Sequence, residues 1–199
     1  VQEVEIVWKQ VVDAAVMTDF LFSPRTEFTP SRADAAYSVE NLLRGFRRSF
    51  PYIDGIHVIG TYGRVVSSSS SLDIPALVDK PWVRAAWVGP IPGLDARVVT
   101  DDYSQLAATR HGRTISVVSR IAPYGEEGNS LVIVIDLNFA AVSRRIEGAP
   151  LGPGAVTMVY SDAGRMLLHP DEEALFSSVM AAAGDRGDDA VLFREGWFE

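Results

Sequence analysis

The chain has 199 residues, 47% of them hydrophobic and 22% charged, so it is long and apolar enough to bury a core as one domain or two small ones. Its formal net charge of −8 argues against nucleic-acid binding, which needs a clustered basic surface. The absence of cysteine excludes disulfides, thiolate metal sites and cysteine nucleophiles. The longest apolar run, Leu131–Ile135, is far shorter than the roughly 18 residues of a membrane span. We expect any membrane anchor of the parent protein to lie outside this sequence.

The first 50 residues are expected to form a helical stalk. Residues 2–18 carry apolar side chains at helical spacing, and two prolines interrupt the periodicity in residues 19–31. A second helix is predicted from about residue 30 to Pro51, with a buried stripe of Ala36, Val39, Leu43, Phe46 and Phe50. The sheet that follows should pack on this stalk. The apolar stripe of the N-terminal helix is also a candidate surface for homodimer formation.

One hairpin organises the chain and recurs later. Ile53–Ser71 is predicted to form a strand, a tight turn and a second strand. Val156–Pro170 has a similar pattern of residues, and aligning Gly63 with Gly164 places the two segments 101 residues apart. A hairpin that recurs after about a domain's length predicts two copies of a small sheet unit.

The remaining elements predict an α+β fold. After the hairpin come short helices within Ser68–Pro90, then strands near Ala96–Tyr103, Arg113–Pro123 and Leu131–Phe139. This order predicts a five-stranded antiparallel sheet with helices on one side. A short helix over Asn138–Gly148 then leads to a unit of about 45 residues, with a hairpin, a helix near Asp171–Ala183 and strands at Val191–Phe193 and Gly196–Phe198.

Taken together, the leading helices and four phrases resemble the double Cache sensor domain, the extracytoplasmic ligand-binding module of bacterial histidine kinases and chemoreceptors. The phrases are IDGIHVIGTYGRVVSSS, KPWVRAAW, RTISVVSRIAPYGEEGNSLVIVIDL and TMVYSDAGRMLLHP. The resemblance is nearest to sensor histidine kinases. It implies an N-terminal helical stalk (1–50), a membrane-distal PAS-like unit that holds the ligand (51–137), a connecting helix (138–150) and a smaller membrane-proximal PAS-like unit (151–199).

The resemblance also implies site residues. Amino-acid-binding members carry an Arg-x-Trp-Tyr phrase and a final Asp on the last strand of the distal unit. Here Lys80 stands in place of the Arg, Trp82 matches, Val83 departs, and Asp136 matches the final Asp that would meet an amino group. Lys80 lacks the bidentate fork with which Arg binds carboxylates.

Further candidate ligand-binding residues follow from their side-chain chemistry, and each has a structural alternative. Trp82 and Trp87 could stack on a ligand or fill the core. Arg84 and Arg120, with Arg97, could bind an anion or lie on a solvated face. Asp101 and Tyr103 lie on a loop that could cover the pocket or form an ordinary turn. Asp136 could anchor a ligand or cap the following helix. The full set of candidates is Lys80, Trp82, Arg84, Trp87, Asp101, Tyr103, Arg120 and Asp136.

No motif predicts catalysis, a metal or a cofactor. The three histidines are scattered without metal-ligand spacing, and no G-x-S-x-G elbow supports a Ser-His-Asp hydrolase. The serines of Ser67–Ser71 are expected to satisfy backbone groups where a strand ends.

The sequence therefore predicts a non-enzymatic, extracytoplasmic sensor domain of a membrane-anchored receptor, most like a histidine kinase, that binds a small solute. Amino acids, organic acids and sugars all remain open as ligands. A chemoreceptor sensor domain and a ligand-free dimerisation or interaction module are the alternatives.

Overall fold

The computed structural model describes residues 2–16, 21, 30–70, 72–88, 95–99, 114–121, 130–147, 158–160 and 166–168. Two helices lead into the sheet, α1 (Gln2–Val16) and α3 (Pro30–Ser49), as the stalk prediction requires. Val7 and Val11 of α1, like Val39 and Leu43 of α3, are four residues apart and buried, so each helix turns one apolar stripe toward the sheet.

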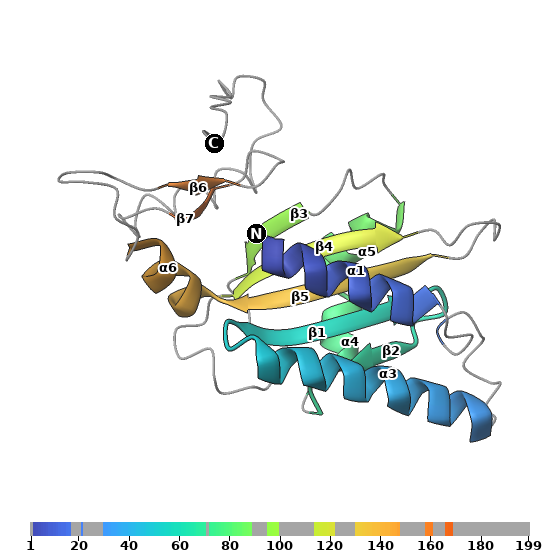
Figure 1. The fold of residues 1–199 in the computed structure, drawn as a ribbon. Helices are drawn as coiled ribbons and strands as arrows, with labels where there is room; N and C mark the ends of the chain where they lie inside the picture. The colour runs from blue at the N-terminus through green and yellow to red at the C-terminus, as the bar shows by residue number, and fades with distance from the viewer. Residues whose placement is uncertain are drawn as a thin grey trace.

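A five-stranded antiparallel sheet forms the centre of the molecule (Figure 1). Its strands are β1 (Ile53–Gly60), β2 (Val65–Ser67), β3 (Asp95–Val99), β4 (Thr114–Ile121) and β5 (Leu131–Asn138), arranged in the order β2-β1-β5-β4-β3. β5 lies between β1 and β4, and its residues from Leu131 to Leu137 are buried, which explains its nearly continuous apolar sequence. The predicted α+β class is confirmed.

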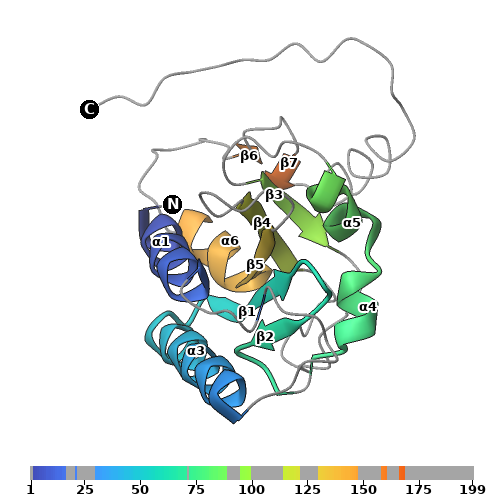
Figure 2. The same cartoon turned by 90° about the vertical axis from the view of Figure 1, so that its right-hand side faces the viewer.

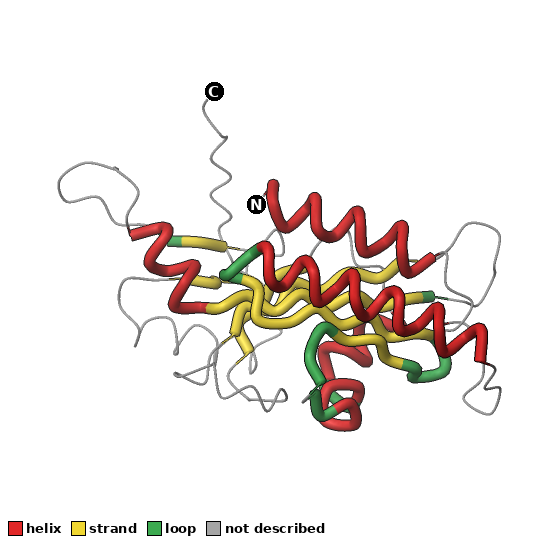
Figure 3. The backbone as a smooth tube through the Cα atoms, turned by 60° about the horizontal axis from the view of Figure 1, so that its bottom comes forward, coloured by secondary structure: helices red, strands yellow, loops and turns green. Residues whose placement is uncertain are grey.

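Helices cover both faces of this sheet, so the prediction of helices on one side is wrong. Figure 3 shows α1 and α3 along one face and the pair α4 (Ile74–Val78) and α5 (Pro81–Val88) against the other. Leu77, Val83 and Ala86 of this pair pack against a second apolar cluster on the sheet, formed by Ile59, Val118, Val132 and Val134. The short helices were predicted, but their amphipathic patterns do not say which face they cover.

The described part of the C-terminal unit confirms the repeated hairpin. β6 (Val159–Tyr160) pairs antiparallel with β7 (Met166–Leu168), and β7 contacts β3 of the large sheet (Figure 2). Tyr160 pairs with Met166, just as Ile59 pairs with Val65 in the first hairpin, 101 residues earlier. The register then shifts by one residue, so that Val159 pairs with Leu168. The helix and strands predicted beyond Pro170 fall outside the residues that the structure describes.

α6 (Phe139–Glu147) follows β5 without an intervening residue. The Oδ1 atom of Asn138 accepts a hydrogen bond from the Ala141 N–H at 2.8 Å, which satisfies a donor of the first helical turn. Phe139 and Val142 pack against the core that α1 and α3 cover. The strand and the helix therefore form one continuous segment.

Candidate ligand-binding site

Asp136 is a buried carboxylate in the middle of the sheet, with 3% of its surface exposed. It lies on the central strand, where it pairs with Gly55 of β1 on one side and Ser116 of β4 on the other. Cross-strand partners project from the same side of a sheet, and Val134 and Val118, two residues along, pack against α4 and α5. Asp136 therefore projects from the α4/α5 face.

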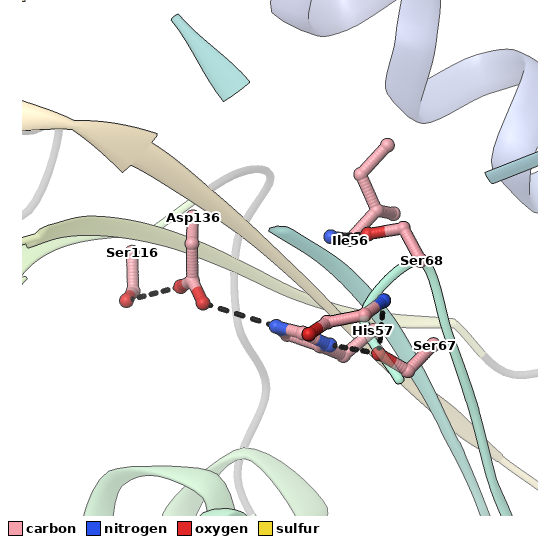
Figure 4. Close-up of polar contacts among 7 residues, drawn as sticks. Ile56, His57, Ser67, Ser68, Ser116 and Asp136 are labelled. Atoms are coloured by element: carbon pink, nitrogen blue, oxygen red, sulfur yellow. Dashed lines mark hydrogen bonds and ion pairs between the residues drawn. The ribbon is translucent and has the colours of Figure 1, made fainter. Parts of the chain in front are cut away.

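Two side chains from neighbouring strands donate to this carboxylate (Figure 4). Ser116 Oγ donates to Asp136 Oδ1 at 2.7 Å, and His57 Nε2 lies 3.1 Å from Asp136 Oδ2. Asp136 is therefore no helix cap, and the capping interpretation of this residue is wrong, because Asn138 caps α6. The carboxylate is part of a polar network inside the sheet.

His57 is the member of this network that the sequence reading missed. Its ring is fully buried, and Nδ1 lies 2.9 Å from Ser67 Oγ on the edge strand β2. His57 thus connects Asp136 on β5 to Ser67, the last residue of β2. Its isolated position among apolar residues of β1 gave only a weak signal, since its partner Asp136 is 79 residues away in the chain.

The serines satisfy backbone donors, as predicted from the sequence. Ser67 Oγ accepts a hydrogen bond from the Ser69 N–H, and Ser68 Oγ accepts one from the Ile56 N–H, both at 2.9 Å. These bonds fix the chain where it leaves β2 and runs toward α4. The additional contact of Ser67 with His57 was not predicted.

Ser67, His57 and Asp136 form a Ser-His-Asp chain, the arrangement that would support a hydrolase. A nucleophilic hydroxyl must reach its substrate, but Ser67 is 9% exposed and His57 is fully buried. The hydroxyl of Ser67 is also engaged by the Ser69 N–H and by the imidazole. The contact is accordingly a buried hydrogen-bond network rather than an arrangement for attack on a substrate.

Trp82 and Trp87 lie on α5, on the same side of the sheet as Asp136. Both are partly buried and pack against the apolar cluster of Ile59, Val118, Val132 and Val134. At least part of each indole therefore serves the packing of α5 on the sheet. Trp82 and Asp136 share a layer of the structure, and that they belong to one ligand site stays a prediction.

The three cationic candidates occupy different environments. Lys80 is half-buried at the junction of α4 and α5, where its N–H donates to Leu77 O and its carbonyl accepts from the Arg84 N–H. Arg84 is exposed and forms an ion pair with Asp79 at 2.6 Å, which fits the solvated-face interpretation. Arg120 lies on β4, four residues after Ser116 and therefore on the same α4/α5 face of the sheet. Its buried Nε has no hydrogen-bond partner among the described residues.

Asp101 and Tyr103 lie outside the described residues, so their predicted covering role stays a prediction. Arg97 is the register partner of Ser116 and therefore stands in the same row of the sheet as Asp136. In the described part of the chain, no three potential metal ligands come together and no helix could span a bilayer.

A second carboxylate, Asp54, lies on β1 near the end of β5. Burial raises its pKa above the ordinary value of 3.8; the Asn138 amide lowers it, the charge of Asp136 raises it further, and Arg47 lowers it. Its Oδ1 is 3.5 Å from Asn138 Nδ2, and its Oδ2 is buried without a partner in the described region. The environment of Asp54 therefore favours the protonated form more than water does.

No protein-family model and no curated protein matches the chain. Among solved structures, it is similar to the sensory domain of the Campylobacter jejuni chemoreceptor Tlp3 (CcmL) with isoleucine bound, at 18% identity and a TM-score of 0.48, over 94% of this chain and 75% of that one. It is also similar to the extracellular domain of soHK1S-Z6, described as a histidine kinase, at 15% identity and a TM-score of 0.49, over 88% of this chain and 68% of that one.

Proposed function

We propose that this chain is the extracytoplasmic ligand-sensing domain of a bacterial transmembrane receptor, and that its distal unit binds a small solute at Asp136. The observation that carries the proposal is the buried Asp136 carboxylate on the α4/α5 face, at the position where the family resemblance implies a ligand anchor. A carboxylate inside an apolar strand costs free energy unless partners or a ligand compensate it. That cost supports a function for this residue beyond packing.

The chemistry around Asp136 favours a ligand with a cationic or N–H donor group and an apolar body. The carboxylate attracts an ammonium group, and the indole of Trp82 offers an apolar surface in the same layer. Arg120, with its unpartnered buried Nε, is a candidate partner for an anionic group at the other end of β4. Aliphatic amino acids combine these features, and the isoleucine bound to the Tlp3 domain supports their inclusion in a screen.

We further propose that the parent protein is a histidine kinase, because the phrases around Gly55, Trp82 and Asp136 resemble the sensor domains of that class most closely. A chemoreceptor is the alternative output. Expression of the domain fused to a histidine kinase or to a chemoreceptor signalling module would separate the two, with ligand-dependent phosphorylation of one fusion as the measurement.

A thermal-shift screen tests the sensing proposal. The compounds are the twenty amino acids, aliphatic amines including 3-methylbutylamine, organic acids including 4-methylpentanoate, and common sugars. At a hundredfold excess over the dissociation constant, a true ligand stabilises the fold by about 2.7 kcal/mol, which raises Tm by about 5–10 °C in a chain of this size. The Asp136→Asn variant keeps the volume and loses the charge, so its shift should fall sharply. Failure of every compound to stabilise the wild-type domain would contradict the proposal.

A second candidate function is a ligand-free dimerisation module of a receptor. It is favoured by the enclosure of Asp136, whose two oxygens already accept from Ser116 and His57. Tyr37 and Leu42 are exposed on α3 and would be the first residues to test for contact between copies. Analytical ultracentrifugation of the wild-type chain and of a double variant, Tyr37→Ser with Leu42→Ser, tests this function. A dimerisation module should form a dimer that the double variant weakens, and no compound of the ligand screen should stabilise it.

A further inference from the structure

The polar network in Figure 4 joins four strands of the sheet, and one residue connects its two halves. Ser116 on β4 and Asp136 on β5 form one half, and Ser67 on β2 with the Ser69 N–H forms the other. His57 on β1 bridges them through its two ring nitrogens. Without His57, Asp136 would keep the hydroxyl of Ser116 on Oδ1, and Oδ2 would lose its contact with the imidazole.

We propose that His57 is the positioning residue of the ligand site: through its Nε2 contact, its imidazole holds the Asp136 carboxylate in one orientation for a ligand's ammonium group. The proposal rests on the function proposed above, because it assigns the charge class of the ligand that Asp136 would meet. His57 would act through Asp136, since its own ring is fully buried and both nitrogens are engaged.

Each ring nitrogen of His57 has a place in the network. A carboxylate oxygen only accepts, so Nε2 is the donor in the contact with Asp136 Oδ2. Nδ1 contacts Ser67 Oγ, which also accepts from the Ser69 N–H. Ser116 Oγ donates to the other oxygen, Oδ1, so a contact on each oxygen fixes the orientation of the carboxylate.

The backbone is adapted to this contact at Gly55. Gly55 is the register partner of Asp136, and a Cβ at this position would stand 2.7 Å from His57 Nε2. Glycine inside a strand is normally unfavourable, because it costs backbone entropy and has no side chain to pack. Here its missing side chain provides the space through which the imidazole of His57 reaches the carboxylate. That space supports a positioning role beyond the filling of a core position.

Two matched variants of His57 test the inference. In His57→Gln the amide nitrogen can occupy the place of Nε2 and donate to Asp136, whereas in His57→Asn it reaches only the place of Nδ1 and can contact Ser67. Each variant loses the ring and one hydrogen bond, so both should lower Tm by similar amounts. The binding probe is 3-methylbutylamine, measured by calorimetry, with 4-methylpentanoate as the control of opposite charge.

We expect His57→Gln to bind the amine within about threefold of wild type, and His57→Asn to bind it at least about tenfold more weakly, the range for loss of a hydrogen bond to a charged group. A conservative rescue by Gln is not expected of a merely structural histidine. Equal affinities of the two variants overturn the inference, as does a wild-type domain that prefers the carboxylate probe.

A ligand-free readout separates this inference from the proposed function. Long-range ¹H–¹⁵N spectra of the His57 ring should show the proton on Nε2, protected from exchange. Crystal structures should show the Asp136 carboxylate in its wild-type orientation in His57→Gln, and turned away from that orientation in His57→Asn, where Ser116 is left to hold it. If the wild type binds neither probe but these results hold, the ligand proposal fails and the positioning role stands. A carboxylate unmoved in both variants, or a ring proton on Nδ1, overturns the positioning role itself.

Discussion

The imidazole of His57 lies directly over Gly55, two residues earlier on the same strand. A Cβ at position 55 would stand 2.7 Å from His57 Nε2, 3.0 Å from Cε1 and 3.5 Å from Asp136 Oδ2. Gly55 and His57 share one face of β1 because side chains alternate along a strand. The missing side chain of one residue is thus the condition for the buried contact of the other.

Gly55→Ala should destabilise the protein by about 1–2 kcal/mol. The new methyl group forces the ring of His57 away from Asp136, and the loss of a buried hydrogen bond costs about 1–3 kcal/mol. The gain of about 0.5–1 kcal/mol from replacing glycine within a strand offsets part of this. Urea denaturation of both proteins measures the difference.

A double-mutant cycle gives the control for that experiment. In a His57→Ala background the ring is absent, so Gly55→Ala should be neutral or stabilising there. An equal loss in both backgrounds would show that the methyl group collides with something other than the imidazole.

Two other glycines should respond to alanine with opposite signs. Gly45 is exposed within α3, and a Cβ there would meet nothing, so Gly45→Ala should stabilise the protein by about 0.5–1 kcal/mol through helix propensity. At Gly60, the last residue of β1, a Cβ would stand 1.9 Å from the carbonyl oxygen of Leu21. Gly60→Ala should therefore cost about 3 kcal/mol, because backbone must shift. Thermal unfolding measures both, and a mild effect at Gly60 would contradict the close approach of Leu21.

Asn138→Ala should destabilise the protein by about 1 kcal/mol through loss of the cap of α6. Asn138→Ser can restore the cap, so it should recover most of the loss. Asn138→Asp also restores the cap but places a second carboxylate near Asp54 Oδ1, so its stability should fall as pH rises. Chemical denaturation of the three variants at pH 4.5 and pH 7 measures these effects, and a pH-independent Asp variant would count against the described contact.

Asp54→Asn should gain stability relative to wild type as pH rises from about 4 to 7. Burial raises the pKa of Asp54 in the folded state, so the folded protein binds the proton more tightly than the unfolded chain does. Between the unfolded and folded pKa values, stability therefore falls with rising pH, and this loss persists above both. Asparagine cannot ionise, so the Asp54→Asn variant does not show this loss of stability. Unfolding free energies across this pH range, with exposed Asp34→Asn as control, test the sign.

Much of the fold could be predicted because its signals are local. The helical spacing of α1 and α3, the apolar run of β5 and the turn at Gly63 each lie within a few neighbouring residues. The placement of α4 and α5 could not, because it depends on which face of the sheet α1 and α3 leave uncovered. The pairing of Tyr160 with Met166 was predictable only through comparison with Ile59 and Val65 in the first hairpin.

A candidate residue could be found from the sequence where one residue type carries the signal. Asp136 stands out as a charge in an apolar strand, and it is buried in the sheet; its role as a ligand anchor stays a prediction. His57 and Ser116 do not stand out, because their importance comes from register: β1 and β4 bring them beside Asp136 from 79 and 20 residues away. An alternation of glycine and histidine on one strand face, opposite an aspartate, is the signal that could have found them.

The direct passage from β5 into α6 has a mechanical consequence. Asp136 is followed by only two residues before the first residue of the helix, and the Asn138 N–H donates to the carbonyl of Tyr52, the residue before β1. A solute that draws the carboxylate toward itself would thus pull on the first turn of α6. A displacement of Asp136 would therefore tilt α6 as a whole, because no loop lies between the strand and the helix to absorb the movement.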